Sequence, residues 1–268
     1  MSLHLRSDAV TMISSMKVAV RSQFAAVPLW LWLIQILTVS VFQMSFFVLM
    51  VDYAGRGSVA LEYVALGNAL QSVTFVTVYA VCSIPGTEKH AGTLSPVMST
   101  PSRLFTVFVG KAMFQIFAGI ITVVISLLFA NQVFGVSFGN ADLVSVAAVI
   151  LVTTFAMTGF GLMLGSIGLY ARSSSVLASL VLYLGLVLCG VNFPVSSLPS
   201  PLQVVSYSLP MTYGVDALRE AVAGAGLLSI GGELAIAAFI GSVMIALSYW
   251  MFRWFEKLAR ERGTTDMF

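Results

Sequence analysis

Charged side chains are scarce in this chain. Only 9% of its 268 residues are Asp, Glu, Lys or Arg, whereas 59% are hydrophobic, and the mean hydropathy is +0.98. Soluble domains carry about 25% charged residues, so this composition cannot cover a globular surface with polar groups. It predicts a multi-spanning membrane protein. The formal net charge of +2 rests on too few cations to form a basic face, so we expect no nucleic-acid partner.

Cysteines and catalytic motifs are also scarce. Cys82 and Cys189 lie far apart inside apolar segments, which favours two buried free thiols over a disulfide framework. The chain lacks a GxxxxGK[ST] phosphate loop and an HExxH motif, and its two histidines do not have a metal-ligand spacing. No base lies near the many Ser and Thr side chains. We therefore expect no catalytic site and no metal site on the chain itself, although it can still belong to an ATP-hydrolysing complex.

Long apolar runs are abundant. A helix needs about 20 apolar residues to cross a bilayer, and six runs qualify. They cover approximately residues 25–51, 61–84, 104–130, 143–169, 175–192 and 234–254. We therefore predict an all-α integral membrane protein, with six transmembrane helices in a single domain over residues 1–268. None of the runs carries a charge near its middle, which disfavours an ion-coupled pump because such transporters usually keep an intramembrane charge.

The basic residues are distributed unevenly between the connecting segments. If both termini are cytoplasmic, eleven of the thirteen Lys and Arg residues lie inside, and only Arg56 and Arg219 lie outside. This bias follows the positive-inside rule and predicts cytoplasmic termini. Within residues 1–23, apolar side chains recur at steps of three or four. This pattern predicts an amphipathic helix in the cytoplasmic interface, with a disordered tail as the alternative.

The second span has a polar face, which is a candidate substrate path. On a helix, five of its residues fall within an arc of roughly 100°. They are Asn68, Gln71, Ser72, Phe75 and Tyr79. Amides in hydrocarbon need hydrogen-bond partners, so this face should meet protein or water rather than lipid. Two interpretations stay open, a lining of the substrate path and hydrogen-bonded packing between helices.

Two connecting segments differ from ordinary loops. Residues 85–103 begin with Pro85 and Gly86 and carry Glu88 and Lys89 near the start of an expected short helix. This brief polar element can dock into a cytoplasmic partner, and a solvated connector is the alternative. The segment from Asn192 to Arg219 holds four of the eight prolines within seventeen residues, yet it is almost as apolar as the rest of the chain.

These two segments resemble a known family. The stretches EKHAGTLSPVMSTPSRLFTVFVGK (88–111) and NFPVSSLPSPLQVVSYSLPMTYGVDALRE (192–220) look like the permease subunits of type-2 ABC exporters. That family carries a GTL…P…GK segment after the second span and an FP…LP…P…Y…R segment after the fifth. Six spans and an N-terminal interfacial helix also match, so the resemblance covers essentially the whole chain.

The resemblance implies a permease in the plasma membrane, surrounded by lipid and paired with a second permease as a homodimer or heterodimer. Two separate ATP-binding subunits would bind ATP and Mg²⁺ and drive export of a drug, antibiotic, peptide, or lipid- or glycan-type substrate. Cargo would pass along the dimer interface, where spans one, two and five meet. The alternatives are a secondary transporter or channel without an ATPase, and a non-transporting immunity or scaffold protein.

The resemblance also assigns roles to individual residues. The residues expected to couple to the ATPase are Glu88, Lys89, Gly92, Thr93, Leu94 and Pro101. Residues 193–220 are expected to form short re-entrant outer helices that close the exit. The residues expected at this outer gate are Phe193, Pro194, Leu198, Pro199 and Pro210. The prolines would begin and end these helices, because proline suits a first turn and breaks a helix interior.

Overall fold

The computed structural model describes residues 2–55, 58–100, 103–170 and 174–262, and all regular structure in these ranges is helical. Five helices are long and apolar enough to cross a membrane. They are α2 (Leu29–Tyr53), a continuous helix made of α3 (Ser58–Val73), η1 (Thr74–Tyr79) and α4 (Ala80–His90), α6 (Leu104–Phe134), α7 (Leu143–Tyr170) and α11 (Gly231–Arg262). The predicted all-α integral membrane fold is confirmed.

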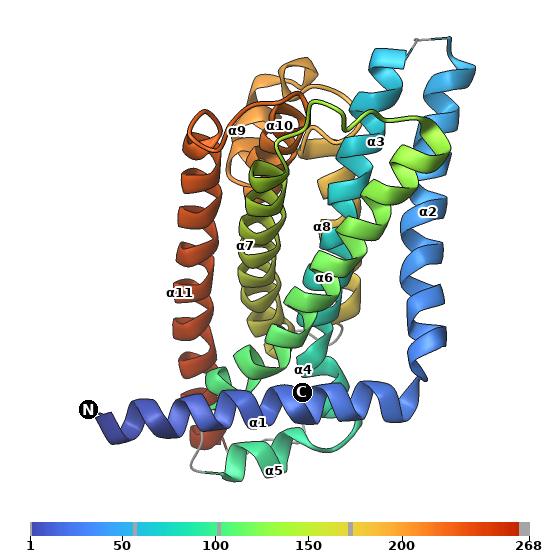
Figure 1. The fold of residues 1–268 in the computed structure, drawn as a ribbon. Coiled ribbons are helices and arrows are strands. Elements are labelled where there is room, and N and C mark those ends of the chain that lie inside the picture. The colour runs from blue at the N-terminus through green and yellow to red at the C-terminus, as the bar shows by residue number, and fades with distance from the viewer. Residues whose placement is uncertain (1, 56–57, 101–102, 171–173, 263–268) are drawn as a thin grey trace.

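Shorter elements lie at the two ends of this bundle. Figure 1 shows α1 (Ser2–Ala26) lying across one end, with α5 (Leu94–Ser99) beside it. The opposite end holds η2 (Val195–Ser197), α9 (Ser200–Tyr207) and α10 (Pro210–Val222). We call these the α1 end and the α10 end. The two connecting segments that the sequence singled out therefore lie at opposite ends of the molecule.

The first span begins later than expected because of a proline. Pro28, with φ −60° and ψ 150°, separates α1 from α2, so the span starts at Leu29 rather than at residue 25. Gly110 of α6 allows α1 to cross closely, because a Cβ there would lie 2.5 Å from the Met12 carbonyl oxygen. Val10 and Ile13, on the apolar face predicted for α1, are 60% and 48% exposed, as expected for a helix in a membrane interface.

The fifth predicted span is shorter than the sequence suggested. The helix α8 (Ser174–Leu188) has 15 residues and extends about 22 Å, whereas the hydrocarbon core is about 30 Å thick. The prediction of a helix to residue 192 is wrong because the chain turns at Gly190. Its φ of +69° lies in the left-handed region that favours glycine. The structure thus has five long helices and this short apolar one within the ranges given above.

The central helix is α7, which contacts the continuous helix as well as α6, α8, α10 and α11. Small residues allow this close packing. A Cβ on Gly241 of α11 would lie 2.5 Å from the Cα of Ala156, and one on Gly159 would lie 2.7 Å from the Gly241 carbonyl oxygen. On another face of α7, a Cβ on Gly161 would lie 3.1 Å from the Thr77 carbonyl oxygen. These glycines therefore serve contacts within the chain.

Candidate functional site

The first candidate site is the turn between α4 and α5, at the α1 end. Glu88 and Lys89 lie in the last turn of the continuous helix, so the prediction that they begin a short helix is wrong. The helix runs through Pro85, which removes one backbone N–H from a long ladder. The hydroxyls of Ser83 and Thr87 donate to carbonyls one turn earlier, at 2.7 and 3.1 Å, and support the helix on both sides of this proline.

Glu88 organises the turn. Its backbone oxygen accepts the Thr93 N–H at 3.0 Å, and its Oε2 accepts the Thr93 hydroxyl at 2.6 Å. Between them, Gly92 has a φ of +68°, which L side chains rarely adopt. The Oε1 atom of Glu88 pairs with the Nζ of Lys111 on α6, and the two side chains are 17% and 13% exposed. One carboxylate therefore shapes the turn and ties it to the next long helix.

Lys89 and Leu94 attach the same turn to two further helices. The Nζ of Lys89 donates to the Leu169 carbonyl oxygen at 2.5 Å, near the end of α7. Leu94 is 6% exposed and belongs to a cluster with Phe108 of α6 and Phe252 of α11. The α4–α5 turn is therefore fixed to α6, α7 and α11, and a push on it reaches all three helices.

The predicted coupling residues divide into two groups. Three are largely buried and hold the turn in place, namely Glu88, Lys89 and Leu94. Two are exposed, namely Gly92 and Thr93. Pro101 lies outside the described residues. The exposed surface of this element also includes His90, Pro96, Ser99 and Thr100, which the sequence did not single out. A role of any of them in coupling stays a prediction.

Sequence reasoning missed Glu256, which helps to build the same region. The backbone N–H of Leu104, the first residue of α6, donates to Glu256 Oε1 at 2.5 Å. The first N–H groups of a helix lack internal partners and favour negative charge, so this carboxylate from α11 caps α6. No local signal marks the pair, because 152 positions separate the two residues in the chain.

The second candidate site is the polar face of the continuous helix, whose apolar window is 83% buried. Asn68 is 2% exposed. Its Nδ2 donates to the Asn192 Oδ1 at 2.8 Å and to the Val64 carbonyl oxygen at 2.9 Å. Its Oδ1 accepts the Nε2 of Gln43 on α2 at 3.4 Å. Asn68 thus joins α2, α3 and the turn after α8.

Gln71 and Ser72 are partnered in the same way. The Nε2 of Gln71 donates to the carbonyl oxygen of Leu182 on α8 at 3.3 Å. The hydroxyl of Ser126 on α6 donates to the Ser72 hydroxyl oxygen at 3.3 Å. Hydrogen-bonded packing therefore accounts for the three small polar residues of this face in the observed conformation. A role in lining the substrate path stays a prediction.

Phe75 and Tyr79, the aromatic members of the face, lie in the π-helical turn η1. Their rings stack at a centroid distance of 5.5 Å with an interplanar angle of 6°, and both side chains are partly exposed. A π-helical turn inside an α-helix often marks a functional site. Sequence reasoning missed this turn because the apolar pattern runs through it without interruption.

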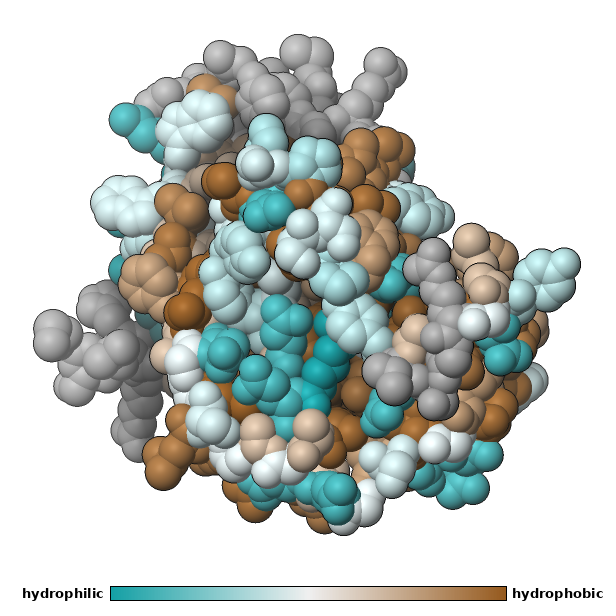
Figure 2. All heavy atoms as spheres, turned by 90° about the horizontal axis from the view of Figure 1, so that it is seen from above, coloured by the Kyte–Doolittle hydropathy of each residue, from teal (hydrophilic) through white to brown (hydrophobic). Residues whose placement is uncertain are grey.

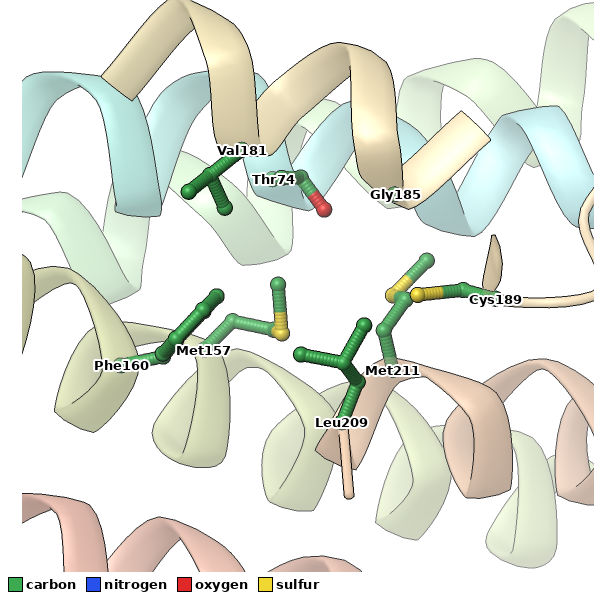
Figure 3. Close-up of a pocket in the computed structure, with 8 residues that line it drawn as sticks. All are labelled: Thr74, Met157, Phe160, Val181, Gly185, Cys189, Leu209 and Met211. Carbon is green, nitrogen blue, oxygen red and sulfur yellow. The ribbon is translucent and has the colours of Figure 1, made fainter. Parts of the chain in front are cut away.

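A small cavity lies between η1, α7, α8 and α10. Figure 3 shows Thr74, Met157, Cys189 and Met211 among the side chains around it. Its volume is about 10 Å³, which is room for about one water molecule. At this level the structure is closed to any cargo.

The third candidate site is the proline-rich segment at the α10 end. Pro194 directly precedes η2, and Pro199 directly precedes α9. Pro201 lies in the first turn of α9, and Pro210 is the first residue of α10. Proline suits these positions because its φ is already helical and its missing N–H would have no partner there. The four prolines thus divide the segment into three short helical pieces.

Buried hydroxyls fix these pieces to the bundle. The Ser206 hydroxyl donates to the Leu188 carbonyl oxygen at 2.6 Å, at the end of α8. The Thr212 hydroxyl donates to the Ser206 carbonyl oxygen at 2.6 Å. Both side chains are almost fully buried, so the corner between α9 and α10 covers the end of α8.

The residues predicted at the outer gate differ in exposure. Pro210 is buried, Phe193 and Leu198 are half-buried, and Pro194 and Pro199 are exposed. All five lie at the α10 end, in or beside the three short helical pieces. Their role as a gate stays a prediction.

Arg219, in the last turn of α10, is the central contact of this end. Its Nη2 donates to the carbonyl oxygens of Tyr63, Gly190 and Val191 at 3.0, 2.9 and 3.0 Å. Its Cζ lies 3.3 Å from the centroid of the Tyr63 ring. The Tyr63 hydroxyl donates to the Gly190 carbonyl oxygen at 3.2 Å. Arg219 thereby joins α10, α3 and the turn after α8. Sequence reasoning counted it only as an outside charge.

An open hollow with a volume of about 520 Å³ lies beside Arg219. Figure 2 shows hydrophilic side chains gathered near the centre of this end. Asp216, Glu220 and Glu233 line the hollow together with Tyr207 and Tyr213. Desolvation raises the pKa of Asp216 above its usual value, although the nearby Arg219 charge acts in the opposite direction. This end therefore holds more carboxylates than cations.

Comparison with known families identifies the fold. The family model of the ABC-2 type transporter matches residues 11–222, from α1 to the end of α10. The chain belongs to the ABC-2 type transporter family. No curated protein matches the chain at a significant level. The family match includes all three candidate sites.

This ABC-2 protein is thus a multi-pass membrane permease, a component of an ABC-type transporter. Permeases of the family generally work with ATP-binding subunits. The resemblance that the two motifs indicated is confirmed.

Proposed function

We propose that this permease forms the membrane path of an ATP-driven exporter in the plasma membrane. Two permeases pair with two ATP-binding subunits, which bind ATP and Mg²⁺. The second permease is a copy of this chain or a relative. The cargo is a drug, an antibiotic, a peptide, or a lipid- or glycan-type molecule, and it leaves from the cytoplasm or the inner leaflet.

The attachment of the α4–α5 turn carries this proposal. The turn protrudes at the α1 end (Figure 1), yet Glu88 is paired with Lys111, and Lys89 is bonded to the Leu169 carbonyl oxygen. A docked subunit that moved this turn would therefore move α6 and α7 with it. A flexible connector would absorb the same motion. Because the chain carries no phosphate loop of its own, the energy has to come from a separate subunit.

The distribution of basic side chains supports a cytoplasmic α1 end. Lys17 and Arg21 lie on α1, and Arg253 and Lys257 lie on the last part of α11, at the same end of the bundle (Figure 1). All four are exposed. Lys and Arg are enriched on the cytoplasmic side of membrane proteins. The α10 end, with its excess of carboxylates, then faces outward.

The packing of α2 supports a path between two permeases. Only 22% of its apolar window is buried, and Trp30, Phe42 and Phe46 are at least 60% exposed. Such a helix packs against lipid or a second subunit. Because the interior cavity of the single chain holds about 10 Å³, cargo requires a route along the surface where two permeases meet.

The proposal is tested by purifying the tagged permease from native membranes in mild detergent. We expect mass spectrometry to find a stoichiometric ATP-binding subunit and the eluate to show vanadate-sensitive ATP hydrolysis. A second permease in the eluate would identify a heterodimer. A lone permease without ATPase activity, in several detergents, would refute the proposal.

A matched pair of variants locates the docking surface. Pro96→Asp places a charge on the exposed face of α5, where an acidic residue in the first turn is compatible with the helix. We expect it to abolish co-purification of the ATP-binding subunit while membrane insertion is retained. Ser197→Asp places the same charge on an exposed position at the α10 end and should not affect co-purification. Equal loss in both variants would contradict docking at α5.

A further inference from the structure

We propose that Arg219 is a two-position latch. In the observed position it holds the turn after α8 closed. In the second position its guanidinium binds the carboxylates of the neighbouring hollow and frees that turn. The purpose of the latch, which is to open the exit at the outer face, rests on the proposed export function. Its geometry and its test do not.

The closed position is held by contacts to two separate segments. The Nη2 atom has two hydrogens, yet three carbonyl oxygens lie within 3.0 Å of it, those of Tyr63, Gly190 and Val191. The donors are therefore shared among acceptors that belong to α3 and to the turn after α8. A planar guanidinium can bridge such a set, whereas the compact ammonium of lysine cannot.

The closed position leaves part of the guanidinium unused. The Nε atom is buried without a hydrogen-bond partner. The contact of Nη1 with Asp216 Oδ1 is long, at 3.4 Å. An unsatisfied buried donor costs free energy, so departure from this position gives up less than the loss of a fully partnered arginine would.

The second position is the carboxylate group of the hollow. Asp216 and Glu233 line the same hollow as Arg219. The Asp216 side chain is 52% exposed, and the Oε2 of Glu233 is buried without a hydrogen-bond partner. Hydrogen bonds between a guanidinium and a carboxylate are stronger than those to a neutral carbonyl. Unpartnered atoms on both sides thus favour an exchange of Arg219 between two sets of acceptors.

The turn that Arg219 holds is irregular backbone that depends on this contact. It follows Leu188, the last residue of α8, and contains Gly190 and Val191. Without Arg219, the Tyr63 hydroxyl remains as the side chain bonded to the Gly190 carbonyl oxygen. Cys189 directly precedes these residues and is 2% exposed. Its thiol is therefore a native reporter of the opening of this turn.

The test measures the rate at which an impermeant maleimide modifies Cys189 from the outer side, in a Cys82→Ser background and in membranes without added cargo or ATP. We expect Arg219→Lys to raise the rate about tenfold, because lysine cannot bridge the three carbonyls. We expect Glu233→Gln to lower the rate about threefold or more, because the second position loses a charged acceptor. Glu62→Gln removes the same charge from α3 and should leave the rate unchanged.

A purely structural role for Arg219 gives a different pattern. Glu233 has no printed bond to lose at its Oε2, so a structural role predicts that Glu233→Gln leaves the Cys189 rate unchanged. That result, or an unchanged rate in Arg219→Lys, would overturn the latch. The labelling of Cys82 in a Cys189→Ser background reports general unfolding and should stay constant in all variants. A rise there would attribute the Arg219→Lys effect to misfolding and would also overturn the latch. Co-purification of an ATP-binding subunit is measured separately, so failure of the latch does not count against the export function.

Discussion

At the scale of single residues, Gly67 shows how little room the α10 end leaves. A Cβ on this residue would lie 2.2 Å from the Val191 carbonyl oxygen and 2.8 Å from Arg219 Nη2. Gly67→Ala should therefore displace the turn after α8 and destabilise the fold by roughly 1–3 kcal/mol. The measurement is the melting temperature in detergent. Gly232→Ala is the control because its Cβ meets nothing within 4 Å, and an equal drop in both variants would contradict the explanation.

A buried hydroxyl gives a second prediction at the residue scale. Ser206→Ala removes the donor to the Leu188 carbonyl oxygen, which lies 2.6 Å away. A buried acceptor left without a partner costs about 1–3 kcal/mol, so we expect a lower melting temperature. Ser208→Ala removes an exposed hydroxyl from the same corner and should change the melting temperature little. If the two substitutions behaved alike, burial would not be the cause.

At the scale of elements, the α4–α5 turn depends on one ion pair. Glu88→Ala should insert and assemble normally, but ATP hydrolysis by the complex should continue with reduced export, because the turn loses its tie to α6. Thr93→Ala removes the 2.6 Å bond to the same carboxylate and should act in the same direction. Both activities are measured in proteoliposomes that contain the purified complex.

The charge swap is the control for this prediction. Glu88→Lys combined with Lys111→Glu restores an ion pair in the reverse orientation and should recover part of the export that either single change removes. Glu220→Ala, an exposed position at the opposite end, should leave coupling intact. Full export in Glu88→Ala would show that the turn does not transmit motion through α6.

At the scale of the whole molecule, orientation is the property that every functional proposal needs. A cysteine at Ser197, exposed at the α10 end, should react with an impermeant reagent only from outside the cell. A cysteine at Ser99, exposed on α5 at the α1 end, should react only from the cytoplasmic side. The native thiols of Cys82 and Cys189 are buried and contribute little background. Labelling of both positions from the same side would overturn the topology.

The sequence by itself determined the class of the protein and its long apolar helices. Hydropathy and helix length are summed over many residues, so the spans starting near residues 104, 143 and 234 were predicted to within a few positions. The prolines at 194, 199, 201 and 210 also mark the starts of short helices, because their effect on the backbone is local. The two motifs were sufficient to indicate the family.

Only the tertiary structure decided where the polar groups find their partners. Arg219 bonds to Tyr63 across 156 positions, and Glu256 caps α6 across 152. The polar face of α3, which the sequence left open between two roles, is hydrogen bonded to α2, α6 and α8. In an apolar surrounding a polar group must be paired, so the sequence announces the need for a partner. Which group meets it depends on how the helices pack, because that packing brings distant positions together.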